Sequence, residues 1–298
     1  MVTVADLTYL ALGCGVQSGT LADLTYLALG CGVQSGTLAE MIAEGDLPPV
    51  DMAIFADTGD EPEYVYEYRD YLKGRLDKVG VRLITVTIGN LVQDLYGGER
   101  TAAIPLYTDI NGSRGRMRRQ CTREYKIAPI EKRVRSELVT RKLARHSKSQ
   151  AVLVNKGVQV ECWLGLSLDE VQRMKPNPAW FIENRWPLID RRLSRLDCLS
   201  WLRERELPQP KKSSCRICPY HNDDYWRFLR DERPDDWKHV VTVDADLRGD
   251  TFNITAAAKA DLFLHRSGQP LDEVDLRTPE ERGQTSFMDI CDEGYCGI

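Results

Sequence analysis

The stretch ADLTYLALGCGVQSGTL, residues 22–38, decides the fold, and it repeats residues 5–21 without a gap. An apolar run is followed by a glycine-rich turn and a helical pattern that ends at Gly45, which predicts a strand, a turn and a helix. The helix should begin after Ser35 with a hydroxyl cap. Only the second copy leads into that helical pattern, because the first runs into the next strand-like segment. We therefore predict that residues 22–38 are the working copy and that the first copy is an N-terminal extension.

Strand-like and helical segments alternate after this stretch. Because such alternation predicts right-handed crossovers and a parallel sheet, we expect an α/β, Rossmann-like fold with helices on both faces and a small, irregular, cysteine-containing C-terminal subdomain. The predicted strands are 24–29, 51–57, 81–88 and 158–166, and the predicted helices are 37–44, 62–76, about 129–146 and 193–205. The predicted domains are a duplicated extension (1–21), a nucleotide-binding α/β domain (22–205) and a Cys-rich subdomain (206–298).

Composition narrows the class of protein. The 298 residues are 42% hydrophobic, which is enough for a sizeable core. The sequence has neither a long apolar run nor a signal-peptide pattern, so we expect no membrane association and a cytoplasmic location. The formal charge of −5 is unevenly distributed: residues 111–150 carry 13 Lys or Arg against three Glu, and residues 269–298 carry eight acids against two Arg. The basic region is either a set of solvated helix faces or a surface for an anionic partner such as nucleic acid.

A glycine-rich turn between a strand and a helix presents backbone N–H groups to an anion. The segment GCGVQS, residues 30–35, contains no GxxxxGK[ST], so it is not a Walker-type phosphate site. It resembles the PP-loop of the adenine-nucleotide α-hydrolase superfamily, with Ser35 at that motif's serine and Gln34 where many members have aspartate.

The resemblance extends in order along residues 24–220, specifically toward the phosphoadenosine phosphosulfate (PAPS) reductase family. The matching segments are ADTG (56–59), CTREYK (121–126), WLGL (163–166), RWPL (185–188) and SCRIC (214–218). It implies a HUP-type sheet and binding of ATP or PAPS, with Ser35 acting in catalysis. The nucleotide-binding residues that it implies are Gly30, Gly32, Val33, Gln34, Ser35, Asp57, Thr58, Gly59, Arg119, Arg123 and Lys126.

One departure from the reductases changes the expected chemistry. Where the reductases place an arginine pair after the WLGL strand, this chain has Asp169 and Glu170, and like charge disfavours a phosphosulfate. We therefore predict a PP-loop enzyme that cleaves ATP between the α and β phosphates to form an adenylate, linked to sulfur transfer or nucleic-acid modification, as in relatives that act in DNA phosphorothioation or accompany CRISPR systems. One alternative is a sulfonucleotide reductase with Cys296 as nucleophile. Another is a non-catalytic nucleotide-binding subunit that docks nucleic acid through the basic 114–148 region.

Nine cysteines without an export signal indicate thiols and ligands in place of a disulfide framework. The CxxC spacing is typical of half a zinc or iron–sulfur site, and His221 keeps a zinc site with one histidine ligand open. The alternative is a set of free thiols, which is what we predict for Cys162 and Cys198. The predicted metal ligands are Cys121, Cys215, Cys218, Cys291 and Cys296.

Overall fold

The computed structural model describes residues 22–97, 104–110, 112–249, 260–278 and 281–282. Its order of elements is an alternation of strands and helices, followed by a helical C-terminal part. The strands are β1 (Leu24–Leu29), β2 (Met52–Ala56), β3 (Arg82–Val86), β4 (Tyr107–Ile110), β5 (Ser113–Arg116), β6 (Ala144–His146), β7 (Val152–Val154), β8 (Val160–Leu164), β9 (Ile182–Arg185) and β10 (Asp261–Phe263). The α-helices are α2 (Val33–Glu44), α3 (Glu63–Asp77), α4 (Leu91–Gly97), α5 (Ala128–Thr140), α6 (Pro187–Asp190), α7 (Arg195–Glu204), α8 (Asp223–Glu232) and α9 (Pro234–Asp246). A π-helix, η1 (Thr122–Ile127), precedes α5, and two 3-10 segments are η2 (Leu168–Arg173) and η3 (Leu271–Glu273).

The central sheet has five parallel strands in the order β3-β2-β1-β8-β9. Leu27 in the middle strand pairs with Ala53 of β2 on one side and Trp163 of β8 on the other. The strand order reverses between β1 and β8, and ligands of doubly wound sheets bind at that switch point, at the carboxyl ends of the strands. The predicted Rossmann-like, HUP-type parallel sheet is confirmed.

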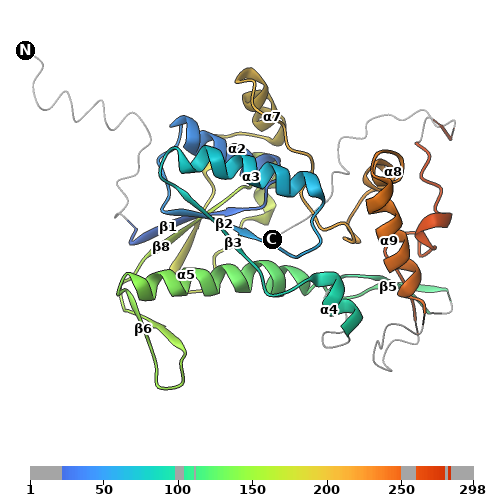
Figure 1. Cartoon of the computed structure of the whole chain (residues 1–298), viewed down its shortest axis with the longest axis horizontal. Coiled ribbons are helices and arrows are strands. Elements are labelled where there is room, and N and C mark those ends of the chain that lie inside the picture. Colours follow the sequence, from blue (N-terminus) through green and yellow to red (C-terminus); the bar gives the residue numbers. More distant parts are fainter. Residues whose placement is uncertain (1–21, 98–103, 111, 250–259, 279–280, 283–298) are drawn as a thin grey trace, which may run out of the picture.

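Helices cover both faces of this sheet, as predicted (Figure 1). One face packs against α2, α3 and α7 around Leu27, Phe55 and Leu72, all at most 1% exposed. The other face packs against α5, where Val134 and Leu138 are fully buried. An apolar face on each side of the sheet explains why β1 and β2 are almost continuously hydrophobic.

A second core joins segments that are distant in sequence. Leu91 of α4, Tyr125 of η1 and Trp226 of α8 are buried together with β10 and the 215–218 loop. The C-terminal part was predicted to be irregular, and that prediction is wrong for residues 222–246, which form two helices. Asn222 caps α8 by accepting from Tyr225 N at 3.0 Å, and Pro234 occupies the first position of α9.

Two further predictions need correction. The helix predicted over 129–146 ends at Thr140, and the chain continues as the β6–β7 hairpin. The polar segment after Leu166 contains β9, the fifth strand of the sheet, which we did not predict. The first copy of the repeat lies outside the described residues, whereas the second copy forms β1 and the start of α2.

Candidate functional site

The turn between β1 and α2 lies at the switch point of the sheet. Cys31 adopts a left-handed conformation (φ 57°), which reverses the chain, and Gly32 is the N-cap of α2. The helix therefore begins two residues before the predicted cap, because Ser35 and Thr37 already lie inside it. No side chain caps this helix, and its first turn has no acidic residue. Its N-terminal N–H groups and the helix dipole thus present a positive end without a built-in anion.

Ser35, in the first turn of α2, stabilises the β1–α2 turn through its side chain. Its Oγ accepts a hydrogen bond from Gly30 N at 3.1 Å. The loop after β8 lies against this same point, since a Cβ on Gly165 would be only 2.6 Å from Ser35 N. A glycine is therefore needed at position 165, and it allows the ends of β1 and β8 to approach each other closely.

Gln34, which replaces the aspartate of the motif, is held by the loop that follows β8. Its Nε2 donates to Ser167 Oγ at 3.3 Å and to Glu170 Oε2 at 3.2 Å, and its Oε1 accepts from Arg195 Nη1 at 3.3 Å. Asp169 and Glu170, the acids that we expected to repel an anion, take part in the same network of hydrogen bonds and ion pairs. Asp169 Oδ1 accepts from Arg195 N at 2.9 Å, and Glu170 forms an ion pair with Arg173.

The segment after β2 forms a second tight turn beside the first. Asp57 Oδ1 accepts from Gly59 N at 2.7 Å and from Tyr66 Oη at 2.8 Å. Burial and the neighbouring Asp57 raise the pKa of Tyr66, so the phenol stays a donor at neutral pH. Gly59 is in the left-handed region (φ 73°), and its carbonyl oxygen accepts from Asn90 Nδ2 at 2.6 Å.

A buried carboxylate, Glu61, lies at the centre of the site, although the sequence reasoning did not single it out. It is 3% exposed, and its Oε1 lies 3.3 Å from Thr58 Oγ1, 3.4 Å from Lys126 Nζ and 3.5 Å from Cys215 Sγ. Its Oε2 is buried and makes no hydrogen bond among the described residues. A buried acceptor without a donor is costly unless a ligand or water supplies one.

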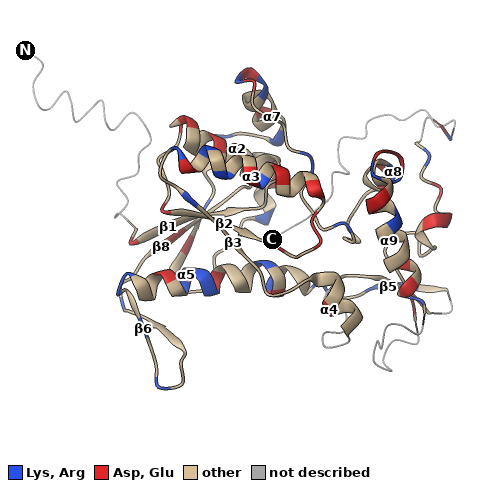
Figure 2. Cartoon of the chain, in the orientation of Figure 1, with Lys and Arg blue, Asp and Glu red and all other residues tan. Residues whose placement is uncertain are grey.

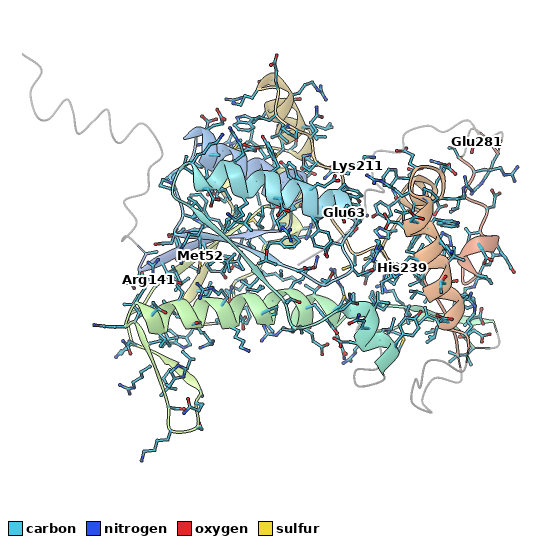
Figure 3. The ribbon with its side chains drawn as sticks, viewed as in Figure 1. Met52, Glu63, Arg141, Lys211, His239 and Glu281 are labelled. Atoms are coloured by element: carbon cyan, nitrogen blue, oxygen red, sulfur yellow. The ribbon has the colours of Figure 1, made fainter. Side chains whose placement is uncertain are left out.

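Asp60, the neighbour of Glu61, fastens the C-terminal part to this turn. It is 1% exposed, and Oδ1 lies 3.0 Å from both Arg216 Nη2 and His239 Nε2. Its Oδ2 accepts from Ile217 N at 3.1 Å. Figure 3 shows His239 on the side of the C-terminal helices that faces the sheet. These contacts give His239 a structural role in joining the C-terminal part to the sheet.

Ser213 extends this attachment to the first turn. Its Oγ donates to Gly30 O, and a Cβ on Gly32 would be 3.5 Å from its own Cβ. The chain just before the CxxC segment therefore covers one side of the β1–α2 turn.

Of the three predicted basic ligands, Lys126 is the one whose described contact reaches the Thr58–Glu61 turn. Arg123 pairs with Glu131 of α5 at 3.0 Å. The guanidinium of Arg119 lies 5.3 Å from the ring centre of Tyr220, which Arg116 also approaches at 5.0 Å. Roles for Arg119 and Arg123 at a nucleotide remain predictions.

The predicted metal or cluster site stays a prediction, because only three of its five cysteines belong to the described residues. No group of three or more His, Cys, Asp or Glu that could hold a metal is found in the part of the chain that the structure describes. Cys215 Sγ lies 3.1 Å from Thr58 Oγ1, and burial, reinforced by Glu61, raises the pKa of this thiol well above its usual value. His221 turns Nε2 toward the Cys215 carbonyl oxygen, at 2.9 Å. Cys291 and Cys296 lie outside the described residues.

The two cysteines predicted to be free thiols, Cys162 and Cys198, are free and buried. Cys162 is 4% exposed and Cys198 is fully buried. Burial raises the pKa of each thiol to about 12, so both remain neutral at physiological pH.

Comparison with known proteins identifies similar structures only. No protein-family model and no curated protein sequence matches the chain. The structure is similar to PAPS reductase from Candida auris in its phosphate complex, with 13% identity and a TM-score of 0.42, over 72% of this chain and 96% of that one. It is also similar to the U34-tRNA thiolase NcsA from Methanococcus maripaludis with its [4Fe-4S] cluster, with 14% identity and a TM-score of 0.40, over 79% of this chain and 76% of that one.

Proposed function

We propose that this protein binds ATP, with its phosphates at the N-terminus of α2, and cleaves the bond between the α and β phosphates. The observation that carries the proposal is the uncapped N-terminus of α2 at the switch point of the sheet. The turn before it contains two glycines, and no acidic side chain of the first helical turn competes for the anion. Backbone N–H groups in this arrangement bind phosphate oxygens.

The groups beside this turn support the binding of a whole nucleotide at the site, and not of a simple anion alone. We propose that Asp57, in the turn after β2, also contacts the nucleotide. Both of its hydrogen bonds reach Oδ1, which leaves Oδ2 for a ligand hydroxyl or amino group. Lys126, held by Glu61 at 3.4 Å, supplies a cation for the phosphates. The ends of β1 and β2 are adjacent in the sheet, so one extended ligand spans both turns.

The proposed reaction is adenylation. A nucleophile of an acceptor attacks the α-phosphorus, the acceptor–phosphorus bond forms, and the bond from that phosphorus to the bridging oxygen breaks. Pyrophosphate leaves with the bonding electron pair, and the acceptor loses its proton to solvent or a base. The N–H groups of α2 and Lys126 stabilise the charge that develops on the phosphates.

The predicted alternatives use the same fold differently. A sulfonucleotide reductase would need the sulfated end of its substrate to face Asp169 and Glu170, and the hydrogen bonds of these acids to Gln34 and Arg195 N fix them beside the turn. A non-catalytic subunit would bind ATP at α2 without turnover. Of the three, adenylation is the function that the site supports best, and we propose that it serves sulfur transfer or nucleic-acid modification.

One experiment separates the adenylating enzyme, the reductase and the non-catalytic subunit. Purified protein is incubated with ATP or with PAPS and a thiol donor, and pyrophosphate, orthophosphate and sulfite are measured. We expect ATP binding by calorimetry and pyrophosphate release that rises with candidate acceptors. Sulfite from PAPS would favour the reductase, and ATP binding without pyrophosphate under any acceptor would favour the silent subunit. Absence of ATP binding would overturn the proposal.

A further inference from the structure

The β6–β7 hairpin projects from the body at the end of the sheet opposite the nucleotide site (Figure 1). At its base, Arg141 donates to Asp23 O at 3.1 Å, beside the first residue of β1, and pairs with Asp51 at 2.7 Å. The nucleotide turn follows the last residue of β1. Six residues of strand separate the two places by about 20 Å, so the hairpin is no part of the site described above.

This hairpin is the centre of an acid-free stretch. Between Glu137 and Glu161 the sequence contains no Asp or Glu but five cations, in a chain whose formal net charge is −5. Four of them form no ion pair within the described part of the chain, whereas most arginines of the body are paired. The unpaired cations are Lys142, Arg145, Lys148 and Lys156, all exposed. In Figure 2 the blue of Lys and Arg marks the hairpin without red beside it.

The hairpin has an inner and an outer face. Ala144 pairs with Val154 on the side that packs on the core below α5. Arg145 pairs with Leu153 on the other side, where Leu153 is 45% exposed. Residues that pair across an antiparallel ribbon lie on the same face. The outer face therefore combines a cation with an apolar contact surface.

The tip of the hairpin is held in one shape by its own hydrogen bonds. Ser147 N donates to Ala151 O at 2.8 Å, and Ala151 N donates to Ser147 Oγ at 3.0 Å. Gln150 completes the turn in the left-handed region, with φ 64°. A preordered tip with a lysine, serines and an amide loses little conformational entropy when it binds.

We infer that the β6–β7 hairpin is a binding arm for duplex DNA, which contacts the phosphate backbone through Arg145, Lys148 and Lys156. Lys, Arg, Ser and Gln side chains are the usual donors to nucleic-acid phosphates, and the major groove of B-form DNA admits a two-stranded ribbon. The deep, narrow major groove of duplex RNA does not. The tip, SKSQA, has no large apolar side chain to insert into a membrane.

The test compares two triple variants of the full chain that remove the same charge. Arg145→Gln, Lys148→Gln and Lys156→Gln neutralise the hairpin. Lys78→Gln, Arg203→Gln and Lys238→Gln neutralise exposed cations elsewhere that form no ion pair among the described residues. Binding to a 25-base-pair DNA duplex, the matching RNA duplex and vesicles with anionic lipid is followed by fluorescence anisotropy or sedimentation at several salt concentrations. The single variant Lys148→Glu, at the tip, provides a second test in case the triple variant does not fold.

We expect the hairpin variant to lose about tenfold or more in DNA affinity and to flatten the slope of log affinity against log salt by about 2 to 3 units. The matched variant should bind like the wild type, and Lys148→Glu should weaken binding in the same direction. Equal losses in both triple variants, unchanged binding in the hairpin variant, or binding of the wild type to RNA or vesicles but not to DNA would each overturn the inference. Calorimetric binding of ATP by the hairpin variant should be unchanged, which separates this test from that of the nucleotide site.

Discussion

The two ends of the central sheet hold their charges in opposite ways. At the carboxyl end, Asp60 and Glu61 are 1% and 3% exposed, and each contacts a basic side chain. At the amino end, Arg145 and Lys148 of the hairpin are exposed and form no ion pair among the described residues. A buried charge without a partner would cost several kcal/mol, so Asp60 and Glu61 need the basic partners that the fold gives them. An exposed cation costs little without a partner, so Arg145 and Lys148 are available to bind a ligand.

The largest effect should come from the carboxylate that joins the two halves of the chain. Asp60→Asn removes the negative charge that faces Arg216 and His239, so we expect a loss of about 3 kcal/mol in the free energy of unfolding. Asp70→Asn is the matched control, since Asp70 is 64% exposed and pairs with Arg69 on the surface. It should change stability by about 0.5 kcal/mol or less. Urea unfolding of both variants measures the difference, and equal losses would contradict the contrast between buried and exposed pairs.

The next effect concerns the close approach of the two central strands. Gly165→Ala places a Cβ 2.6 Å from Ser35 N, so the loop must shift, at a cost of about 1 to 3 kcal/mol. Because the shift displaces the turn at α2, ATP binding should be lost as well. Gly74→Ala on α3 meets no atom within 4 Å and should stabilise that helix by up to about 1 kcal/mol. Thermal unfolding and ATP calorimetry on both variants decide the matter; a Gly165→Ala protein that binds ATP normally would contradict it.

A buried thiol gives an effect that is absent at neutral pH and develops only at alkaline pH. Burial raises the pKa of Cys198 to about 12, while the thiol of the unfolded chain ionises near its usual value of about 8.5 to 9. The folded state keeps its proton between these values and the unfolded state does not, so stability is present below about pH 9 and falls as pH rises toward 12. The slope should be about 1.4 kcal/mol per pH unit from this group.

Replacing the thiol isolates that contribution. Cys198→Ala should lose about this much of the slope between pH 9 and pH 11, measured by urea unfolding at each pH. Identical slopes in the variant and the wild type would show that Cys198 does not titrate differently in the two states.

The sequence predicted the elements whose signals are local. The strand, turn and helix of residues 22–44, and the alternation that follows, rest on apolar runs and glycines that neighbour one another. The β6–β7 hairpin was missed because the end of the predicted helix, VTRKLARH (139–146), mixes apolar and basic residues and contains no Gly or Pro that would stop a helix. The cap at Asn222 and Pro234 at the start of α9 were local signals that could have predicted the C-terminal helices.

The contacts that build the site had no such signal. Asp60 and Glu61 meet Arg216 and Cys215 across more than 150 residues of chain, and Gly165 meets Ser35 across the switch point. A sequence gives the types of these residues but not the partner that the fold brings to each. Their importance becomes visible only in the structure, in the burial of Asp60 and Glu61 and in the lack of space for a Cβ at Gly165.

The smallest effect tests which copy of the repeat works. Ser35→Ala removes the hydroxyl that accepts from Gly30 N at 3.1 Å, which is worth about 1 kcal/mol, or roughly fivefold in ATP affinity if the turn binds the phosphates. Ser18 is the same residue in the first copy, outside the described residues, so Ser18→Ala is a control in identical local sequence. We expect calorimetry to show weaker ATP binding for Ser35→Ala alone. The two serines lie in the same repeated sequence, and Ser35 has β8 and the 211–215 segment beside its turn. Equal losses would therefore mean that either copy can occupy the place of β1 and α2.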